Sequence, residues 1–162
     1  MQRNIRIDKN TGQASVKDVV WAVTGREGSA ATQLTKALVA KHKDTLDGKI
    51  RDVRIDGKGQ ETPVASFAVL TDVIFLVRAP SRSCHVAQPA AVTYPSVRMQ
   101  VETCLRESKR TLEKKFDIAR TLGKLMDADP APLYRWAEDY VHEYHSCDKP
   151  CPAFLVEMLS KE

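Results

Sequence analysis

The sequence predicts an α+β fold: a small antiparallel sheet or hairpin with short helices, followed by a C-terminal region built around one long helix. Two observations predict it. Short runs of alternating or β-branched residues, near residues 4–8 and 51–64, are bounded by Gly-containing turns, which is typical of strands. Later, apolar residues recur at helical spacing from Ser96 to about Leu125. A chain of 162 residues is long enough for one domain with a helical appendage.

The first half of the chain supplies the predicted sheet and its first helices. Asn4–Asp8 alternates polar and apolar residues and is predicted to be a strand that pairs with a later hairpin. A helix is expected over Ser15–Thr24, capped by the side chain of its first residue and ended by Gly25. A second helix is expected over 29–42, with an apolar stripe on one side and lysines on the other.

The segment Arg51–Val64 predicts the hairpin itself. Alternating residues lead into Gly57-Lys58-Gly59, which predicts a tight turn with a cationic tip, and the chain then returns towards Val64. Ser66 is a suitable N-cap for the apolar helix that follows, through Leu76. The predicted unit is therefore a hairpin followed by a helix.

This unit resembles a known family. The block Val53–Val64, read as VRIDGKGQETPV and followed by an apolar helix, resembles the Bro and KilA type antirepressor domains of phages, large DNA viruses and some protist and algal genomes. The run Ala14–Val20, followed by Thr24 and Gly25, is similar to the first helix of that module. The resemblance implies a small α+β domain over residues 1–80 that binds DNA or a regulatory partner in transcription regulation. A nuclear or virus-associated protein would follow.

The remaining organisation is a Pro-rich linker over 81–95 and a helical dimerisation or packing region over 96–162. A helix over Ser96–Leu125 would be about 45 Å long, more than so small a core can cover. Part of its apolar stripe should therefore contact either a second copy of the chain or the last helices of the same chain. We favour the homodimer. The aromatic residues around Trp136 are expected to pack against this long helix, with ligand recognition as the alternative.

Charge is distributed unevenly along the chain. The net charge is +4, but residues 1–60 carry +5 and residues 126–162 carry −5. This split indicates a polyanion partner for the first part and a protein partner or self-association for the last; the alternative is a solvated surface with chance asymmetry. The predicted nucleic-acid-binding cations are Lys41, Lys43, Lys49, Arg51, Arg54 and Lys58. Their contacts with phosphate would give salt-dependent binding with little sequence preference.

The two helices on either side of 25–28 also allow a helix-turn-helix interpretation, with the second helix entering a major groove. Of the residues that open this second helix, only Thr32 and Gln33 have side chains able to contact base edges. The alternative is a helix that only packs within the fold.

Four residues near the C-terminus form a candidate metal site: His142, His145, Cys147 and Cys151, in the array H-x2-H-x-C-x3-C. Structural zinc prefers four tetrahedral nitrogen and sulfur ligands, and histidines three residues apart share a helix face. The alternative is exposed histidines at a helix end, with small buried thiols nearby. Cys84 and His85 are the alternative ligands. In an intracellular chain the four cysteines, Cys84, Cys104, Cys147 and Cys151, argue against a disulfide framework.

The sequence predicts no enzyme and no membrane protein. It contains no G-x-S-x-G, Walker, H-E-x-x-H or dinucleotide-binding motif. No apolar run approaches the ~20 residues of a membrane-spanning helix, and the first residues lack the apolar core of a signal peptide. We therefore expect an intracellular DNA-binding regulatory protein that contacts mainly phosphate, as a homodimer. The alternative is a non-enzymatic adaptor or assembly protein, for example a viral one, that binds a protein partner through its C-terminal helices.

Overall fold

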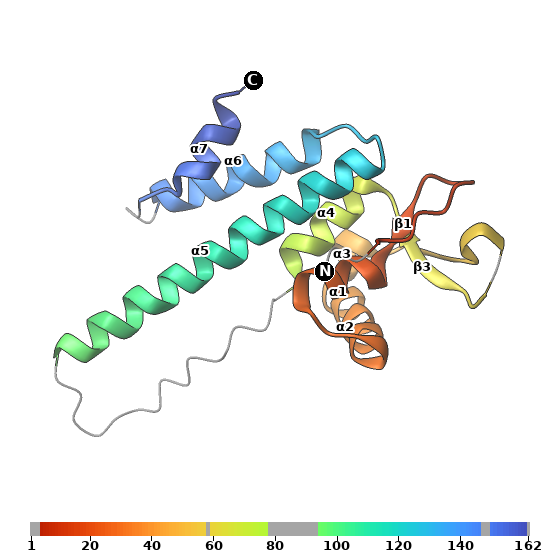
Figure 1. Cartoon of the computed structure of the whole chain (residues 1–162), viewed down its shortest axis with the longest axis horizontal. Helices are drawn as coiled ribbons and strands as arrows, with labels where there is room; N and C mark the ends of the chain where they lie inside the picture. Colours follow the sequence, from red (N-terminus) through yellow and green to blue (C-terminus); the bar gives the residue numbers. More distant parts are fainter. Residues whose placement is uncertain (1–3, 58, 78–93, 147–149, 162) are drawn as a thin grey trace.

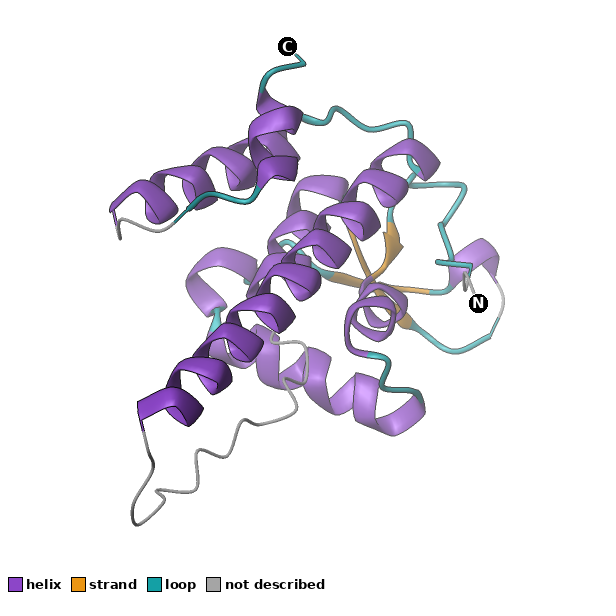
Figure 2. Cartoon of the chain, turned by 60° about the vertical axis from the view of Figure 1, so that its left-hand side comes forward, coloured by secondary structure: helices purple, strands orange, loops and turns teal. Residues whose placement is uncertain are grey.

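The structure is a computed structural model that describes the backbone of residues 4–57, 59–77, 94–146 and 150–161, and the side chains of all these except 94–108 and 146. The described residues form seven α-helices and a three-stranded antiparallel sheet, so the predicted α+β class is confirmed (Figures 1 and 2). Within this described part, no helix is both long and apolar enough to cross a membrane.

The elements follow the chain in a simple order. They are β1 (Ala14–Ser15), α1 (Val16–Thr24), α2 (Gly28–Lys41), α3 (Lys43–Leu46), β2 (Arg51–Val53), the 3-10 turn η1 (Ile55–Gly57), β3 (Thr62–Ala65), α4 (Phe67–Leu76), α5 (Tyr94–Leu125), α6 (Ala131–Ser146) and α7 (Ala153–Leu159). Of these, the two-residue β1, the four-residue α3 and the turn η1 have no counterpart among the predicted elements. A single helical turn is too short to show a period of apolar residues.

Helix α1 begins and ends where its sequence predicts. The Ser15 hydroxyl accepts a hydrogen bond from the backbone N–H of Asp18 at 3.3 Å, which satisfies one of the free N–H groups of the first turn. At the other end Gly25 has a φ of 72°, a left-handed conformation that glycine adopts without strain, and its N–H donates to Trp21. Both predicted helix ends are therefore confirmed.

The sheet has the order β1-β3-β2, and the predicted hairpin is its β2-β3 pair. The predicted tight turn is wrong, because residues 54–61 separate the two strands and contain η1. The predicted strand at Asn4–Asp8 is also wrong. The backbone N–H of Asp8 donates to Gln13 and the chain folds back, so Ile7 forms only a single bridge with Ala14. The third strand is β1, which pairs with β3.

Helix α4 is the centre of the fold. Seven of its ten residues are buried, because it packs against α1 as well as α5 and α6. A helix that is apolar on nearly all sides needs such a complete cover. In Figure 1, α5 runs past α4, and α6 and α7 lie above α5 in this view, while α6 also packs against α4. One continuous hydrophobic core therefore joins the hairpin half of the chain to the C-terminal helices.

The apolar stripe of α5 is buried within the same chain wherever its side chains are described. The stripe consists of Leu112, Phe116, Ala119 and Leu122, all at 7% exposure or less. Around it lies an aromatic cluster, in which Phe75 stacks on Trp136 with ring centroids 5.0 Å apart. The Trp136 indole N–H also donates to Asp72 at 2.9 Å. The described part of α5 therefore packs against helices of the same chain, which is the alternative to the homodimer. The homodimer itself stays a prediction.

Candidate nucleic-acid interface and metal site

The predicted basic residues occupy one continuous stretch of the chain, from the end of α2 through α3 to just after β2. The five that the structure describes are all exposed: Lys41, Lys43, Lys49, Arg51 and Arg54. The sixth, Lys58, lies outside the described residues. Among the described residues, none of the five forms an ion pair. Their charges therefore face water and are available to an anionic partner.

Local backbone geometry spaces these cations. Helix α2 ends after Lys41 because His42 leaves the helical conformation, at φ −116° and ψ 43°, and α3 then begins at Lys43. The buried Leu46 anchors α3 to the core. Gly48, with a φ of 69°, turns the chain towards β2. The break at His42 and the turn at Gly48 thus separate α2, α3 and β2, whose basic side chains are exposed.

The loop between β2 and β3 is held by Asp8. One carboxylate oxygen of Asp8 accepts hydrogen bonds from the hydroxyl and the N–H of Thr11, at 2.6 and 3.1 Å, and the other accepts from the N–H of Asp56 at 3.4 Å. The bond from the Thr11 hydroxyl is the main reason why the pKa of Asp8 lies below its ordinary value. Asp56 has a φ of 54°, so this bond fixes an uncommon backbone conformation. Sequence reasoning missed the role of Asp8 because its partner lies 48 residues away.

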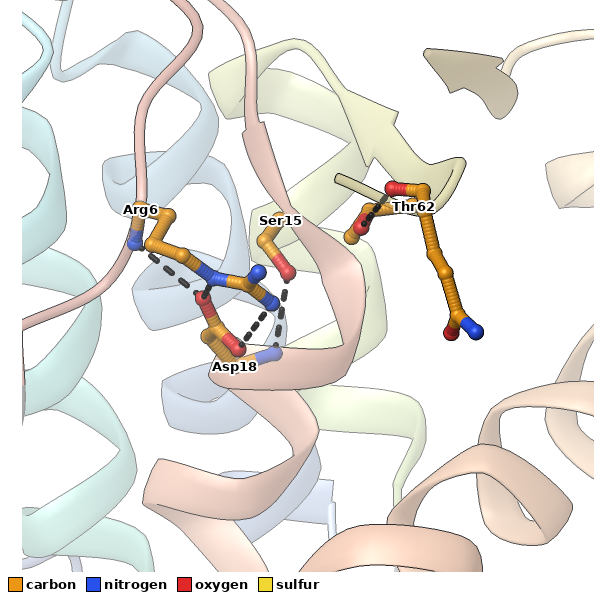
Figure 3. A network of polar contacts seen from close by, with 5 residues as sticks. Arg6, Ser15, Asp18 and Thr62 are labelled. Carbon is orange, nitrogen blue, oxygen red and sulfur yellow. Dashed lines mark hydrogen bonds and ion pairs between the residues drawn. The ribbon is translucent and has the colours of Figure 1, made fainter. Parts of the chain in front are cut away.

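A neighbouring cation is already paired. The Arg6 guanidinium contacts both oxygens of Asp18, at 2.8 and 3.0 Å, in a bidentate arrangement (Figure 3). The Asp18 carboxylate also accepts a hydrogen bond from the backbone N–H of Arg6. The backbone N–H of Asp18 in turn donates to the Ser15 hydroxyl. Arg6 is thus committed to holding the N-terminal segment on α1, unlike the five unpaired cations.

Carboxylates are interspersed among the five cations. Asp44, Asp47 and Asp52 are exposed in the same stretch, so its net charge is only +2. Repulsion between these carboxylates and phosphate would weaken any single long groove contact. This arrangement favours a few separate phosphate contacts along one edge.

Helix α2 packs on α1 through one face, which consists of Ala31, Thr35 and Leu38. Of the two residues considered for base contacts, Gln33 is exposed and Thr32 is half-buried. The Thr32 hydroxyl donates to the backbone oxygen of Gly28 within the helix, so its proton is not free for a base. The contacts of α2 with α1 are those expected of a helix that packs within the fold, which is the alternative to a helix that enters a DNA groove.

The predicted metal ligands are only partly described. His142 and His145 are exposed on the last turns of α6, and Cys151 is half-buried before α7. Burial raises the pKa of the Cys151 thiol, and this thiol donates to the Pro152 backbone oxygen at 3.8 Å. Cys147 lies outside the described residues, and within the described ones no three His, Cys, Asp or Glu side chains are grouped to hold a metal ion. The zinc site stays a prediction.

Metal analysis tests this site. We expect one zinc per chain in protein purified without chelators, because two nitrogen and two sulfur ligands complete a tetrahedral site. A double variant, His142→Ala with Cys151→Ala, should lose the metal and melt at a lower temperature, since metal binding contributes to folding. The double variant Cys84→Ala with His85→Ala, which changes the alternative ligands, is the matched control and should keep the zinc. Less than a tenth of an equivalent in the wild-type chain would contradict the prediction.

Comparison of the sequence with protein-family models finds no matching model, and comparisons with curated proteins and with solved structures find no match either.

Proposed function

We propose that the chain is a regulatory DNA-binding protein that contacts the phosphate backbone through Lys41, Lys43, Lys49, Arg51 and Arg54. One observation carries this proposal: five exposed cations without ion-pair partners among the described residues lie within one short stretch, on the outside of the hairpin and α3. When lysine and arginine side chains neutralise DNA phosphates, they release the counterions condensed on the DNA, and this release favours binding.

The polar groups of α2 indicate whether the protein contacts DNA through phosphates or through bases. Backbone contacts position a protein on DNA without reading its sequence, whereas base contacts need a helix or strand whose polar side chains point outward. On α2 the Thr32 hydroxyl is engaged with its own helix, which leaves Gln33 as the main candidate for a base contact. We therefore propose weak sequence preference. The resemblance of Val53–Val64 to Bro and KilA type domains supports the same function.

Salt dependence tests the proposal directly. Five phosphate contacts predict a slope of about −4.5 when the logarithm of the association constant is plotted against the logarithm of salt concentration. The measurement is fluorescence anisotropy of a labelled duplex at 50 to 200 mM salt. The double variant Lys49→Glu with Arg51→Glu should weaken binding by about tenfold or more and flatten the slope, because two contacts become repulsive.

Lys124→Glu with Lys161→Glu is the matched control, since both are exposed cations far along the chain from the hairpin. It makes the same change of net charge and should leave the slope unchanged. Absence of binding at 50 mM salt, or equal loss in the control, would contradict the proposal. Light scattering on the same sample tests the homodimer, whose mass would be twice 18.1 kDa.

A further inference from the structure

A cleft of about 1170 Å³ lies between the helices α2 and α3 and the β2-β3 hairpin. Its floor contains partly exposed aliphatic side chains from both sides, Val39 from α2 and Ile50, Ile55 and Pro63 from the hairpin segment. Sites for small ligands usually measure about 300–1,000 Å³. This cleft is larger, and its apolar floor remains in contact with water.

The two walls of the cleft carry opposite charges. Lys36 and Lys43 line it from the helices, with Asp47 at the end of α3, whereas Asp52, Asp56 and Glu61 line it from the hairpin, so the helix side is net positive and the hairpin side negative. All six side chains are exposed, and none forms an ion pair with another described residue. Duplex DNA would meet repulsion from the hairpin wall. A partner with an acidic group on one side and a basic group on the other is complementary to both walls.

The cleft also reaches the edge of the sheet. Asp52 belongs to β2, which is the outer strand in the order β1-β3-β2, and no other described strand pairs with its outer edge. An unpaired strand edge presents backbone N–H and C=O groups that an extended peptide can bind. The alternating side chains of such a peptide would then point into the cleft and away from it.

From these observations we infer that the cleft binds a short extended peptide segment of a partner protein, with an apolar side chain between an acidic and a basic residue. The apolar side chain covers Val39 and Ile50, the acidic residue faces Lys36 and Lys43, and the basic residue faces Asp52. This inference does not depend on DNA binding, because four of the five cations proposed for DNA lie outside the cleft.

Two alanines of α2 provide a matched test. Ala37 and Ala40 are both exposed, but only Ala40 lines the cleft. A library of random twelve-residue peptides displayed on phage is selected on the full chain, and enriched peptides are synthesised with a fluorophore for anisotropy measurements. We expect enriched peptides with the stated charge pattern. Ala40→Glu should weaken their binding at least tenfold, whereas Ala37→Glu should leave it unchanged, and glutamate is well tolerated in helices.

Charge reversal tests the orientation of the peptide. Lys36→Glu should weaken binding about fivefold, and replacing the acidic residue of the peptide by lysine should restore it. The inference is overturned if no peptide is enriched, or if enriched peptides bind the Ala40→Glu variant as tightly as the wild-type chain. It is also overturned if Ala40→Glu instead weakens binding of a labelled DNA duplex, because the cleft would then belong to nucleic acid. Circular dichroism confirms that each variant keeps its helical content.

Discussion

Replacing Phe116 by alanine is expected to lower the free energy of unfolding by about 3–5 kcal/mol. Phe116 is 1% exposed and lies where three helices meet α5. Its ring centroid is 4.7 Å from that of Phe75 in α4, 6.1 Å from Tyr140 in α6 and 5.7 Å from Phe154 in α7. The cost combines lost burial, a cavity and lost aromatic contacts.

Urea unfolding measures this effect by circular dichroism and by tryptophan fluorescence. The two probes should give one coincident transition, because the hairpin half and the C-terminal helices share a core. Lys124→Ala, at an exposed position of the same helix, is the control and should change the free energy of unfolding by less than about 0.5 kcal/mol. A loss below about 1 kcal/mol for Phe116→Ala, or two separate transitions, would show that the core is not shared.

The second large effect is a rise in stability between about pH 8 and pH 10.5 that depends on Lys115. Lys115 is buried, and its amine donates to the backbone oxygens of Phe75 at 3.3 Å and Val77 at 2.7 Å, at the C-terminal end of α4. The charge suits the negative end of the helix dipole. Burial nevertheless lowers the pKa of the amine from 10.5 to about 8, because the charged form loses its hydration.

The sign follows from proton binding. Between these two pKa values the unfolded chain holds a proton on Lys115 that the folded chain has released, so the free energy of unfolding rises with pH. The full shift in the pKa of Lys115 corresponds to a change of roughly 3 kcal/mol in the free energy of unfolding. Partial hydration of the amine reduces this change to about 2 kcal/mol. Below pH 8 both states are protonated and this contribution is constant.

Lys115→Met isolates the effect, because methionine fills similar space without a titrating group. Burial raises the pKa values of Tyr140 and Cys151, so their contributions fall as the pH rises through this range and above it. These contributions are common to both proteins and cancel in the difference between wild type and variant. Equal pH dependence of the wild type and Lys115→Met would contradict the role assigned to this amine.

The helices were predictable wherever local signals agreed. Ser15 and Gly25 mark the ends of α1, as expected for an N-cap serine and a left-handed glycine. The first strand was misplaced because alternation in 4–8 suggests a strand, whereas Asp8 draws the chain into a turn. Lys115 interrupts the apolar stripe in sequence. Its two backbone acceptors lie 38 and 40 residues away, so no local pattern could identify it as the cap of α4.

The candidate sites also differ in how far the sequence could predict them. That Lys41 and Arg51 are exposed could be expected from their charge alone. The cleft could not be expected, because its walls come from α2, α3 and the hairpin, and their approach depends on packing around Leu46. Contacts between distant segments also determine which cations are engaged, as the pairing of Arg6 with Asp18 illustrates.

The covering of α4 by α5 and α6 has a consequence for biosynthesis. When a ribosome has just completed Leu76, the residues of α5 and α6 that cover this helix, as far as Tyr140, have yet to be made. At about 5–20 residues per second, the growing polypeptide takes roughly 3–13 s to add these residues, during which only α1, among the described helices that pack on α4, is available to cover that helix. During that interval it is a substrate for chaperones, and it is most prone to aggregate with neighbouring nascent chains.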